Sequence, residues 1–422
     1  MKVTLSKLSL ISLFCYIILS LLLLIYVRKN VREKVKELRQ SELKKLSRRN
    51  EDGEKYDVKK LLQNKVENKE VVFTTSEKKI KRPFKSILIY STLFGLEYWP
   101  TLSLKEIKTF MNRCDVKECT ITYDKEKISS VDAVLFHGVD VKNNKHYAPS
   151  ILRNVSTQRR RDQKWVFFIQ ESPDNYNDFS EYEGLFNWLM SYKYTSDIQN
   201  PYGHFKLLEP WDPIPSKTVN YAQNKDKVGV WFISNCGHPR DNFMKELKRY
   251  VAITVGGKCA MKIFNEEEKC DYGSDDCIKL IKRHKFIFAF ENSFCDYYVS
   301  EKYWNKGIDF GLVPVVMGAR YDNYNVIPGS YIDASKFKSI EQLGSYLNYL
   351  DHNDTAYNEY FSWKRKYKRI GYEKMCELCK ALHENRYGRR YKDIWSSKED
   401  CAPFEWKKEM MKQMTEMSKR KS

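Results

Sequence analysis

The stretch that decides the fold is FAFENSFCDYYVSEKYWNKGIDFGLVPVVMGA, residues 288–319. It opens as an apolar strand and passes through a polar loop into a segment of helical length. Ser300 can cap that segment and Gly311 can end it, because serine accepts backbone N–H bonds and glycine tolerates the left-handed turn. The apolar run Val313–Met317 follows at once. Strand, helix and strand in succession predict a parallel sheet covered by helices.

The same alternation continues over most of the chain. Further β-rich runs lie at 86–94, 133–138, 164–171, 229–234, 252–257 and 286–291, and amphipathic stretches such as 241–250 separate several of them. The proline-rich segment PWDPIPSKTVNYAQNKDK (210–227) indicates a boundary. The predicted fold class is therefore α/β, with one domain over residues 84–215 and a second over 225–395. Ligands of parallel sheets bind beyond the carboxyl ends of the strands, so the expected site is a cleft between the two domains.

Three strand ends carry side chains with useful chemistry. Glu171 follows an apolar strand and can act as a general base, although a salt bridge is the plainer interpretation. Lys302 and Glu301 fall in the first turn of the capped helix, where a lysine suits a diphosphate, while a capping glutamate and a surface lysine would explain both equally well. Arg240 begins the helix after the strand at 229–234 and suits bidentate contact with phosphate.

Several common ligand motifs are absent from the sequence. It contains no Walker loop, no GxGxxG and no Asp-x-Asp. The pair Cys376 and Cys379 has only His383 as a near companion, which is too little for a zinc site. No metal site is therefore predicted, and the charge of a bound diphosphate would be met by Arg, Lys and helix ends.

Residues 8–27 (LSLISLFCYIILSLLLLIYV) contain no charged side chain. Twenty such residues in a helix span ~30 Å, the thickness of a bilayer core, which favours an uncleaved transmembrane signal anchor over a signal peptide. Residues 1–7 would then be a cytoplasmic tail, residues 28–83 a charged stem, and residues 396–422 a basic C-terminal tail. The 74 Lys and Arg residues exceed the 55 Asp and Glu by 19, and much of this excess lies in the stem.

Two sets of features point to opposite orientations of the anchor. Basic residues such as Arg28 and Lys29 follow the apolar run, and this placement alone would leave the long C-terminal part in the cytosol. Ten cysteines beyond Cys15 indicate an oxidising compartment, and the sequons at Asn154 and Asn353 are usable only in the lumen. We choose the lumenal orientation. A basic arm that binds nucleic acid would explain the charge but not the anchor.

Together these segments resemble the α1,3-fucosyltransferases, type II Golgi membrane proteins that use GDP-fucose. The segments that carry the resemblance are FENSFCDYYVSEKYWNKGIDFGLVPVVMG (290–318), CTITYDKEKISSVDAVLFHG (119–138), FIQESP (168–173), FNWLMSYKYTSDIQNPYG (186–203), LEPW (208–211), YNEYFSWK (357–364) and the CxxC at 376–379. They occur in the family's order and cover residues 85–395. The fold that the resemblance implies is GT-B, two Rossmann-like domains with the acceptor side first and the donor side second.

The resemblance also implies a reaction and a set of residues. The 3-OH of an acceptor GlcNAc attacks GDP-β-L-fucose with inversion, and no cofactor is required, although a divalent ion could stimulate release of the diphosphate. Glu171 would be the general base. The implied donor-binding residues are Arg240, Tyr298, Glu301, Lys302 and Asn292, with Asn305 and the 311–316 segment on the same wall. Cys376 and Cys379 resemble cysteines that bridge back to the start of the catalytic region, here Cys114 and Cys119.

Some questions stay open at this point. Ser300 stands where the family usually has Thr, Gly138 where many vertebrate members have a second His after His137, and Lys193 where Arg is frequent. The expected partners are GDP-fucose, a GlcNAc-containing glycan and the Golgi membrane, without nucleic acid; a homodimer is left open. The acceptor GlcNAc can belong to a lactosamine-type chain or to an N-glycan core. The alternative function is a catalytically silent Golgi homologue that binds glycans.

Overall fold

A computed structural model describes residues 83–99, 111–112, 114–266, 274–318, 321, 326–371, 374–396 and 401. The expected anchor at 8–27, most of the stem and most of the C-terminal tail lie outside these residues. Among the residues described, no helix is both long and apolar enough to cross a membrane. The chain divides into two compact units, residues 1–80 and 81–422, and every element below belongs to the second.

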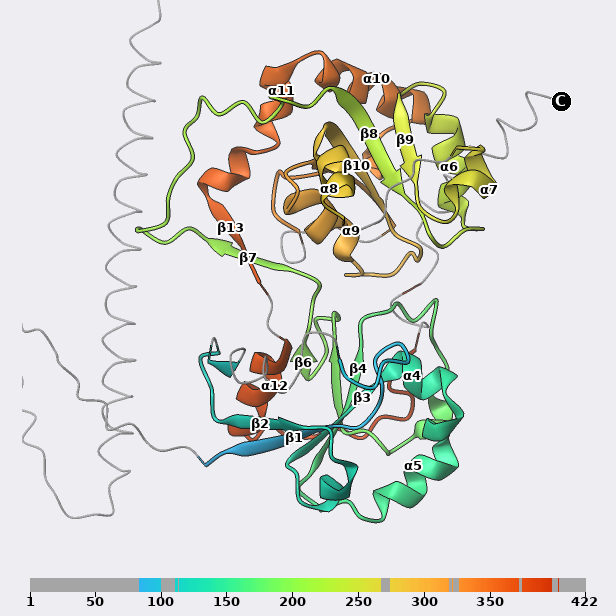
Figure 1. Ribbon diagram of the computed structural model, residues 1–422, viewed down its shortest axis with the longest axis vertical. Helices are drawn as coiled ribbons and strands as arrows, with labels where there is room; N and C mark the ends of the chain where they lie inside the picture. Colours follow the sequence, from blue (N-terminus) through green and yellow to red (C-terminus); the bar gives the residue numbers. More distant parts are fainter. Residues whose placement is uncertain are drawn as a thin grey trace, which may run out of the picture. The chain divides into compact units, whose positions relative to one another are not determined.

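The first sheet has six strands in the order β2-β1-β3-β4-β5-β6, and all neighbours are parallel (Figure 1). These are β1 (Lys85–Ile89), β2 (Cys119–Thr122), β3 (Ala133–His137), β4 (Lys164–Ile169), β5 (Trp188–Ser191) and β6 (Ile198–Gln199). Residues alternate between two cores along β3: Val134 and Phe136 belong to one, and Ala133 and Leu135 to the other. Both faces are therefore buried, as parallel sheets require.

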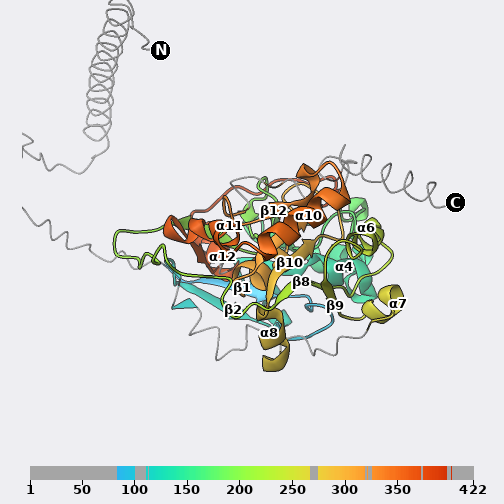
Figure 2. The same cartoon turned by 90° about the horizontal axis from the view of Figure 1, so that it is seen from above.

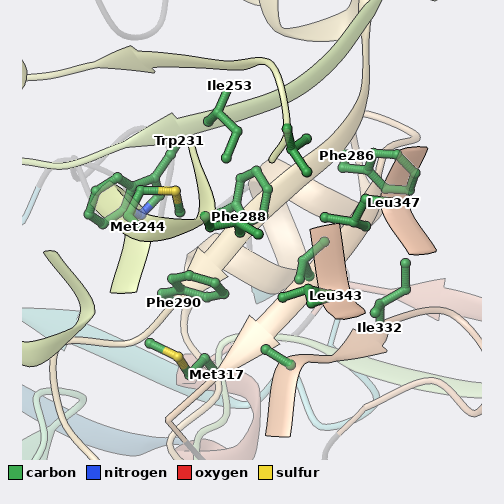
Figure 3. Packing of buried hydrophobic residues seen from close by; sticks show 14 of the residues in the cluster. Trp231, Met244, Ile253, Phe286, Phe288, Phe290, Met317, Ile332, Leu343 and Leu347 are labelled. Atoms are coloured by element: carbon green, nitrogen blue, oxygen red, sulfur yellow. The ribbon is translucent and has the colours of Figure 1, made fainter. Parts of the chain in front are cut away.

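The second sheet has five parallel strands in the order β12-β11-β10-β8-β9. They are β8 (Lys227–Phe232), β9 (Ile253–Gly256), β10 (His284–Phe290), β11 (Val313–Met317) and β12 (Ile332–Asp333). In its main core Phe288 and Phe290 of β10 pack against Trp231, Leu343 and Leu347 (Figure 3). The expected fold class, two parallel α/β sheets, is confirmed. We call each sheet with its helices the first and the second lobe.

Helices pack against both sheets. They are α4 (Gly138–Asn143), α5 (Pro149–Ser156), α6 (Pro239–Leu247), α7 (Ala260–Phe264), α8 (Asp275–Lys282), α9 (Glu301–Tyr303), α10 (Ile340–Asp351), α11 (Asp354–Glu359) and α12 (Lys374–His383), with shorter turns η1 (Lys125–Ser129), η2 (Lys145–Tyr147), η3 (Ser180–Tyr182), η5 (Ala334–Lys336) and η6 (Ser362–Arg365). α10 contacts α6 and β8, and α7 lies beside β9 in both views (Figure 1, Figure 2). A separate antiparallel pair joins β7 (His204–Leu207) to β13 (Tyr367–Ile370).

The helix expected over 300–310 is interrupted. Only α9 is α-helical, and the next turn, η4 (Trp304–Ile308), is a π-helix. The turn packs closely on β11 because position 307 is a glycine. A Cβ at this position would lie 2.6 Å from the side chain of Pro314. Gly311 ends the segment with a positive φ of 68°, as its place in the sequence predicts. π-Turns inside helices often lie at functional sites.

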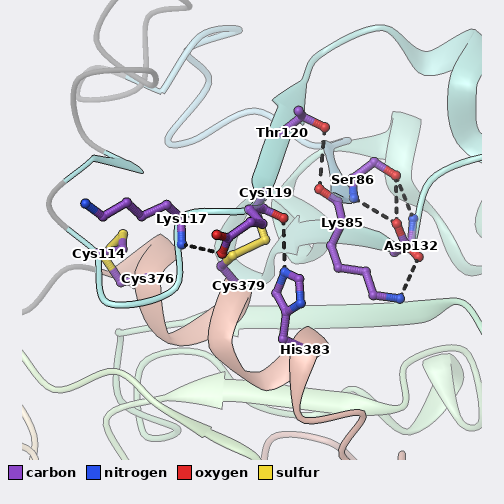
Figure 4. Close-up of a disulfide and its surroundings, with 11 residues drawn as sticks. Lys85, Ser86, Cys114, Lys117, Cys119, Thr120, Asp132, Cys376, Cys379 and His383 are labelled. Atoms are coloured by element: carbon purple, nitrogen blue, oxygen red, sulfur yellow. Dashed lines mark hydrogen bonds and ion pairs between the residues drawn. A yellow bond between two sulfur atoms is a disulfide. The ribbon is translucent and has the colours of Figure 1, made fainter. Parts of the chain in front are cut away.

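The last helix, α12, packs against β1 and β6 of the first sheet, although the proposed domain bounds assign it to the second domain. Two disulfides fix it there, Cys114–Cys376 and Cys119–Cys379 (Figure 4). The resemblance to the fucosyltransferases implies bridges among these same four cysteines. They close loops of about 260 residues, which stabilises the fold mainly by restricting the unfolded chain.

Candidate functional site

The candidate site lies where β4 of the first lobe and β10 of the second come to an end. Glu171 and Ser172 follow β4, and residues 291–300 connect β10 to α9; we call this connection the 291–300 loop. Ser172 Oγ donates to Ser293 Oγ at 2.5 Å, and Tyr298 Oη donates to Glu171 Oε2 at 3.3 Å. The two lobes thus touch through the segments that sequence analysis singled out.

Glu171 is a partly buried carboxylate that accepts one hydrogen bond among the described residues, from Tyr298. Burial raises the pKa of Glu171, the positive charge of Lys302 opposes that rise, and the hydrogen bond from Tyr298 also lowers the pKa; the net shift is upward. A carboxylate whose pKa is raised holds a proton more readily than usual. Tyr298 occupies Oε2, so Oε1 is the oxygen that remains for a substrate proton. These are the properties of a general base.

The 291–300 loop is organised around Glu291, whose side chain is fully buried. Its Oε1 accepts from Ser300 N at 2.8 Å, and its Oε2 accepts from Ser300 Oγ at 2.8 Å and Lys302 Nζ at 3.0 Å. Ser300 also caps α9 by accepting from Lys302 N. Sequence analysis placed Glu291 at a strand end but gave it no role. Its position directly after an apolar strand and before the polar residues Asn292 and Ser293 was the available signal.

Lys302 lies in a cluster of mixed charge. Its Nζ is 3.0 Å from Glu291 and 3.6 Å from Glu301, and Lys306 Nζ is 3.7 Å from Glu301. Burial alone would lower the pKa of Lys302, but the carboxylates of Glu291 and Glu301 outweigh it and the pKa is raised. Burial would raise the pKa of Glu301, yet Lys302 and Lys306 lower it. Both side chains are therefore held in their charged forms.

Arg240 lies on α6 and is almost fully buried, with 3% of its surface exposed. Its Nη1 donates to Phe290 O at 2.6 Å and its Nη2 to Asn235 O at 3.0 Å, while Nε has no hydrogen-bond partner among the residues that the structure describes. Burial lowers the pKa of Arg240, although an arginine stays protonated. The guanidinium thus anchors the end of β10 and keeps one unused donor.

The remaining residues expected at the site differ in their placement. Asn292 lies in the 291–300 loop, and its buried Oδ1 has no partner within the described ranges. Asn305 is exposed in η4 and accepts from Arg369 at 3.2 Å, so it faces another element. Tyr202 was not singled out, yet it donates to the backbone oxygen of Gln170 at 2.9 Å, directly before Glu171.

Next to β4, the end of β3 carries a buried His137. Its Nδ1 is 2.5 Å from Asp140 Oδ2, and Asp140 also accepts from the backbone N–H groups of Phe94 at 2.7 Å and Gly95 at 2.8 Å. Burial would raise the pKa of Asp140, but these hydrogen bonds outweigh it and the pKa is lowered. Asp140 therefore fixes both the imidazole and the neighbouring turn. Sequence analysis noted His137 but missed Asp140.

The Phe94–Gly95 turn presents an aromatic ring to solvent. Both residues have positive φ, 50° and 82°, a conformation that a phenylalanine rarely adopts. Phe94 is 63% exposed, and its ring centroid lies 4.7 Å from that of His137 in an edge contact. A strained backbone that holds an apolar ring in water is more typical of a binding surface than of a stabilising contact.

Among the residues that the structure describes, no group of possible metal ligands includes the residues of this site. In the described part of the chain, two groups of His, Cys, Asp and Glu come close enough to share an ion: Cys119, Cys379 and His383, and Asp174, Cys295 and Cys401. The sulfurs of both groups are joined in disulfides and cannot act as thiolates. Neither group includes Glu171 or Lys302.

Two hollows among the described residues lie away from the site. One of about 670 Å³ is lined by the amino ends of β8 and β9, the opposite end from the site. Another of about 550 Å³ lies around Asp197, His204 and Glu377. We assign the site from the convergent polar groups, because ligands of parallel sheets bind at the carboxyl ends of the strands.

Comparison with known families covers both lobes. Residues 82–203 match the model "Fucosyltransferase, N-terminal", and residues 222–397 match "Glycosyltransferase family 10 (fucosyltransferase) C-term". These two matches include Glu171 in the first segment and the 291–300 loop in the second. The regions that carry the sequence resemblance are thus the regions that the family models recognise.

Curated relatives show the same similarity. The chain is 30% identical over 336 residues to "Glycoprotein 3-alpha-L-fucosyltransferase A" of Drosophila melanogaster, with 76% of this chain and 62% of that protein covered. It is 30% identical over 286 residues to "4-galactosyl-N-acetylglucosaminide 3-alpha-L-fucosyltransferase FUT6" of Homo sapiens, with 66% and 75% covered. The chain therefore spans less than two thirds of the Drosophila protein.

Among solved structures, the chain is similar to "Crystal Structure of alpha1,3-Fucosyltransferase with GDP-fucose". The identity is 16%, the coverage is 80% of this chain and 92% of the other, and the TM-score is 0.41. This structural likeness is weak. The fold is assigned from the two parallel sheets. The family is assigned from the matching family models and the curated relatives.

Proposed function

Because the chain belongs to glycosyltransferase family 10, the fucosyltransferases, we propose that it transfers fucose from GDP-β-L-fucose to the 3-OH of a GlcNAc residue in a glycoprotein or glycolipid glycan. The reaction inverts the configuration at the anomeric carbon. The observation that carries the proposal is the contact between Tyr298 and Glu171, because it brings a carboxylate of raised pKa from one lobe against the charged loop of the other.

Glu171 is the general base in this proposal. As the acceptor oxygen attacks the anomeric carbon of fucose, Oε1 takes the proton of the 3-OH and the bond from that carbon to the phosphate oxygen breaks. The proton ends on Glu171 and the negative charge ends on GDP. The raised pKa of Glu171 supports this role, because a base must hold the proton once it has received it.

Lys302 and Arg240 balance the charge that develops on the diphosphate. Lys302 is held in its charged form by Glu291 and Glu301, and Arg240 has a buried Nε that no described residue accepts from. Preorganised cations beside the leaving group stabilise a transition state without having to reorganise. In this scheme Tyr298 and Asn292 contact the nucleotide side, and Glu301 accepts from hydroxyl groups of the fucose.

The diphosphate is met by protein cations in this proposal, and no cofactor is required. The lack of an Asp-x-Asp motif in the sequence supports that reading. A divalent ion could still stimulate release of GDP by binding the free diphosphate.

The acceptor binds on the side of His137 and the Phe94–Gly95 turn. An exposed ring there can stack against the apolar face of a pyranose, and Asp140 keeps both groups in place. A lactosamine-type GlcNAc and an N-glycan core GlcNAc both have such a face. Parallel assays on the two acceptors are therefore needed to show which kind of GlcNAc is used.

The proposal includes a lumenal, single-pass placement in the Golgi membrane, with residues 8–27 as anchor, 28–83 as stem, 84–215 and 225–395 as catalytic domains and 396–422 as tail. Four disulfides among the described residues support an oxidising compartment: Cys114–Cys376, Cys119–Cys379, Cys236–Cys259 and Cys295–Cys401. Of the two sequons, Asn154 is exposed on α5 and Asn353 caps α11. A homodimer remains compatible with this placement.

The test is transfer of labelled fucose from GDP-fucose by the full chain. We expect an α1,3-linked product, with the linkage assigned by NMR spectroscopy. Glu171→Gln is the control, since it keeps the shape of the side chain and removes the base. Binding of GDP without transfer to any GlcNAc acceptor would favour the alternative, a catalytically silent homologue of the same fold.

A further inference from the structure

After α12, the chain returns along the first lobe. We call residues 387–396, together with Cys401, the C-terminal strap. It is held on the first lobe by hydrogen bonds from Arg389 N to Asn187 O at 2.8 Å, from Gly184 N to Tyr391 O at 3.1 Å, from Trp188 Nε1 to Tyr387 O at 3.1 Å and from Phe179 N to Asp393 Oδ1 at 3.3 Å. Its position is therefore set by β5 and the segment before it, in the lobe that carries Glu171.

The same strap is covalently joined to the second lobe. Cys401 forms a disulfide with Cys295, which lies in the middle of the 291–300 loop, is 1% exposed and is 106 residues away in sequence. Cys295 packs in the core cluster of the first lobe, although it follows β10 of the second. The loop that bears Tyr298 is thus tied to the lobe that bears Glu171.

An aromatic series runs from the strap to the general base. The Trp395 ring is fully buried and meets Tyr192 edge-on at 5.7 Å between centroids, and Tyr192 lies 5.2 Å from Tyr298. Tyr298 in turn donates to Glu171. Each ring limits where the next can lie, because buried side chains are close-packed. The position of the Tyr298 hydroxyl therefore depends on Trp395.

The backbone beside Tyr298 needs such support. Tyr297 has a positive φ of 62°, which is unfavourable for a residue with a bulky side chain. Its ring stacks on Tyr194 of the first lobe at 5.8 Å. A strained residue keeps its conformation only where its surroundings hold it. The disulfide two residues before it and the stacked ring supply that restraint.

We propose that Cys401 and Trp395 of the C-terminal strap are positioning residues, which hold the 291–300 loop against the first lobe so that Tyr298 and Glu171 stay in the geometry needed for transfer. This rests on the proposed function, since it concerns the same site. Neither residue touches the substrate. Their effect passes through Cys295 and Tyr192, and a loosened loop would misplace the base and admit water to it.

The test measures kcat, the KM for GDP-fucose and the pH dependence of kcat/KM for the full chain carrying Cys401→Ser. We expect kcat to fall by about tenfold, because small displacements of catalytic groups are costly, while the KM stays within about twofold. We also expect the acid limb of the profile to move to lower pH. Burial is the largest cause of the raised pKa of Glu171, and water that enters the site would remove part of it. A weakened hydrogen bond from Tyr298 would act in the opposite direction, but it is a smaller cause of the shift than burial.

Further variants separate positioning from folding. Cys295→Ser/Cys401→Ser leaves no free thiol at this bridge and should match Cys401→Ser. Trp395→Phe keeps a ring against Tyr192 and loses no hydrogen bond, because Nε1 has no partner among the described residues; it should retain wild-type kinetics. Trp395→Ala should reproduce the loss of kcat and the moved acid limb.

Cys114→Ser is the matched control, since it also removes one disulfide, in a bridge to α12 that does not involve the 291–300 loop. Its pH profile should superimpose on that of the wild type. The proposal would be overturned if Cys401→Ser and Trp395→Ala kept the wild-type kcat and the wild-type pH profile of kcat/KM. It would also be overturned if the unfolded fraction of each variant alone explained its loss of kcat. An equal shift in Cys114→Ser would overturn it too. If the wild-type chain transfers no fucose, the proposed function itself fails, and the two failures are thereby distinguished.

Discussion

Tyr298 of the 291–300 loop donates a hydrogen bond of 3.3 Å to Glu171 Oε2, across the two lobes. The contact acts on the pKa of Glu171 against the effect of burial: burial raises that pKa, and the hydrogen bond lowers it because it stabilises the charged form. The second lobe therefore helps to set the basicity of a carboxylate that belongs to the first. This relationship leads to the first two predictions.

Glu171→Gln removes the base and keeps the size of the side chain. We expect turnover to fall by ~100-fold or more, the usual contribution of a general base, while the affinity for GDP remains near that of the wild type. Single-turnover kinetics and GDP titration by calorimetry check the two parts separately. Turnover within a few-fold of the wild type would remove Glu171 from its assigned role.

The pH dependence of kcat/KM reports the protonation of Glu171 in the free enzyme. Only the deprotonated carboxylate can accept a proton, so activity should be lost as pH falls through the raised pKa, at a higher pH than for an ordinary glutamate. Tyr298→Phe removes the hydroxyl that lowers this pKa and keeps the ring that buries the site. Its acid limb should move to higher pH, the opposite direction from Cys401→Ser. A profile identical to that of the wild type would contradict the assignment.

Lys302→Ala tests the cation of the site. The affinity for GDP should fall by about 10-fold or more, because a charge-assisted contact to phosphate is lost. The variant should also be less stable by about 3 kcal/mol, since the buried Glu291 would lose its ion-pair partner. Lys279→Ala on the surface of α8 is the control for the loss of one positive charge. Unchanged GDP affinity of the folded variant would exclude Lys302 from the donor site.

Phe94→Ala tests the acceptor side. The ring is 63% exposed and its backbone is strained, so its removal should leave the free energy of unfolding within about 1 kcal/mol of the wild type. If the ring stacks on a sugar, the KM for the acceptor should rise by about 3- to 10-fold, while the KM for GDP-fucose stays constant. Tyr349→Ala is the control, because Tyr349 is an aromatic residue on α10 that is 53% exposed. Equal acceptor KM values in wild type and Phe94→Ala would refute the stacking role.

Removal of divalent ions tests the charge balance at the diphosphate. Activity should persist in excess EDTA, because Lys302 and Arg240 carry the charge that a metal would otherwise meet. Added Mn²⁺ or Mg²⁺ could raise turnover through release of GDP, and this increase would show no fixed stoichiometry with the protein. Complete loss in EDTA, restored by one ion per chain, would show that the metal-free mechanism is wrong.

Much of the fold could be predicted from the sequence because its signals are local. The runs at 133–138, 164–171 and 313–317 each contain a continuous apolar stretch, and the structure places β3, β4 and β11 there within a few residues. Since the carboxyl ends of parallel strands share one edge, the placement of Glu171 and the 291–300 loop at such edges followed from the same patterns. Gly311 ends its segment for the reason that glycine commonly ends helices.

Other features depend on contacts that no local pattern specifies. The π-turn of η4 arises where Gly307 meets Pro314, and the sequence there is typical of an ordinary helix. Nothing in the spacing of ten cysteines couples Cys295 to Cys401, since that bridge depends on how the strap crosses the first lobe. Asp140 was missed for a similar reason: its partners Phe94 and Gly95 follow β1 and approach it only when β1 and β3 pair.

The most direct test of the central claim is fucose transfer by the full chain from GDP-fucose, measured in parallel on N-acetyllactosamine and on a paucimannose N-glycopeptide, with Glu171→Gln alongside. The proposal predicts an α1,3-fucosylated product on at least one acceptor, and its loss in the variant. Transfer to one acceptor alone would also identify the kind of GlcNAc that is recognised. Bound GDP with no product on either acceptor, or equal product from Glu171→Gln, would contradict the proposal.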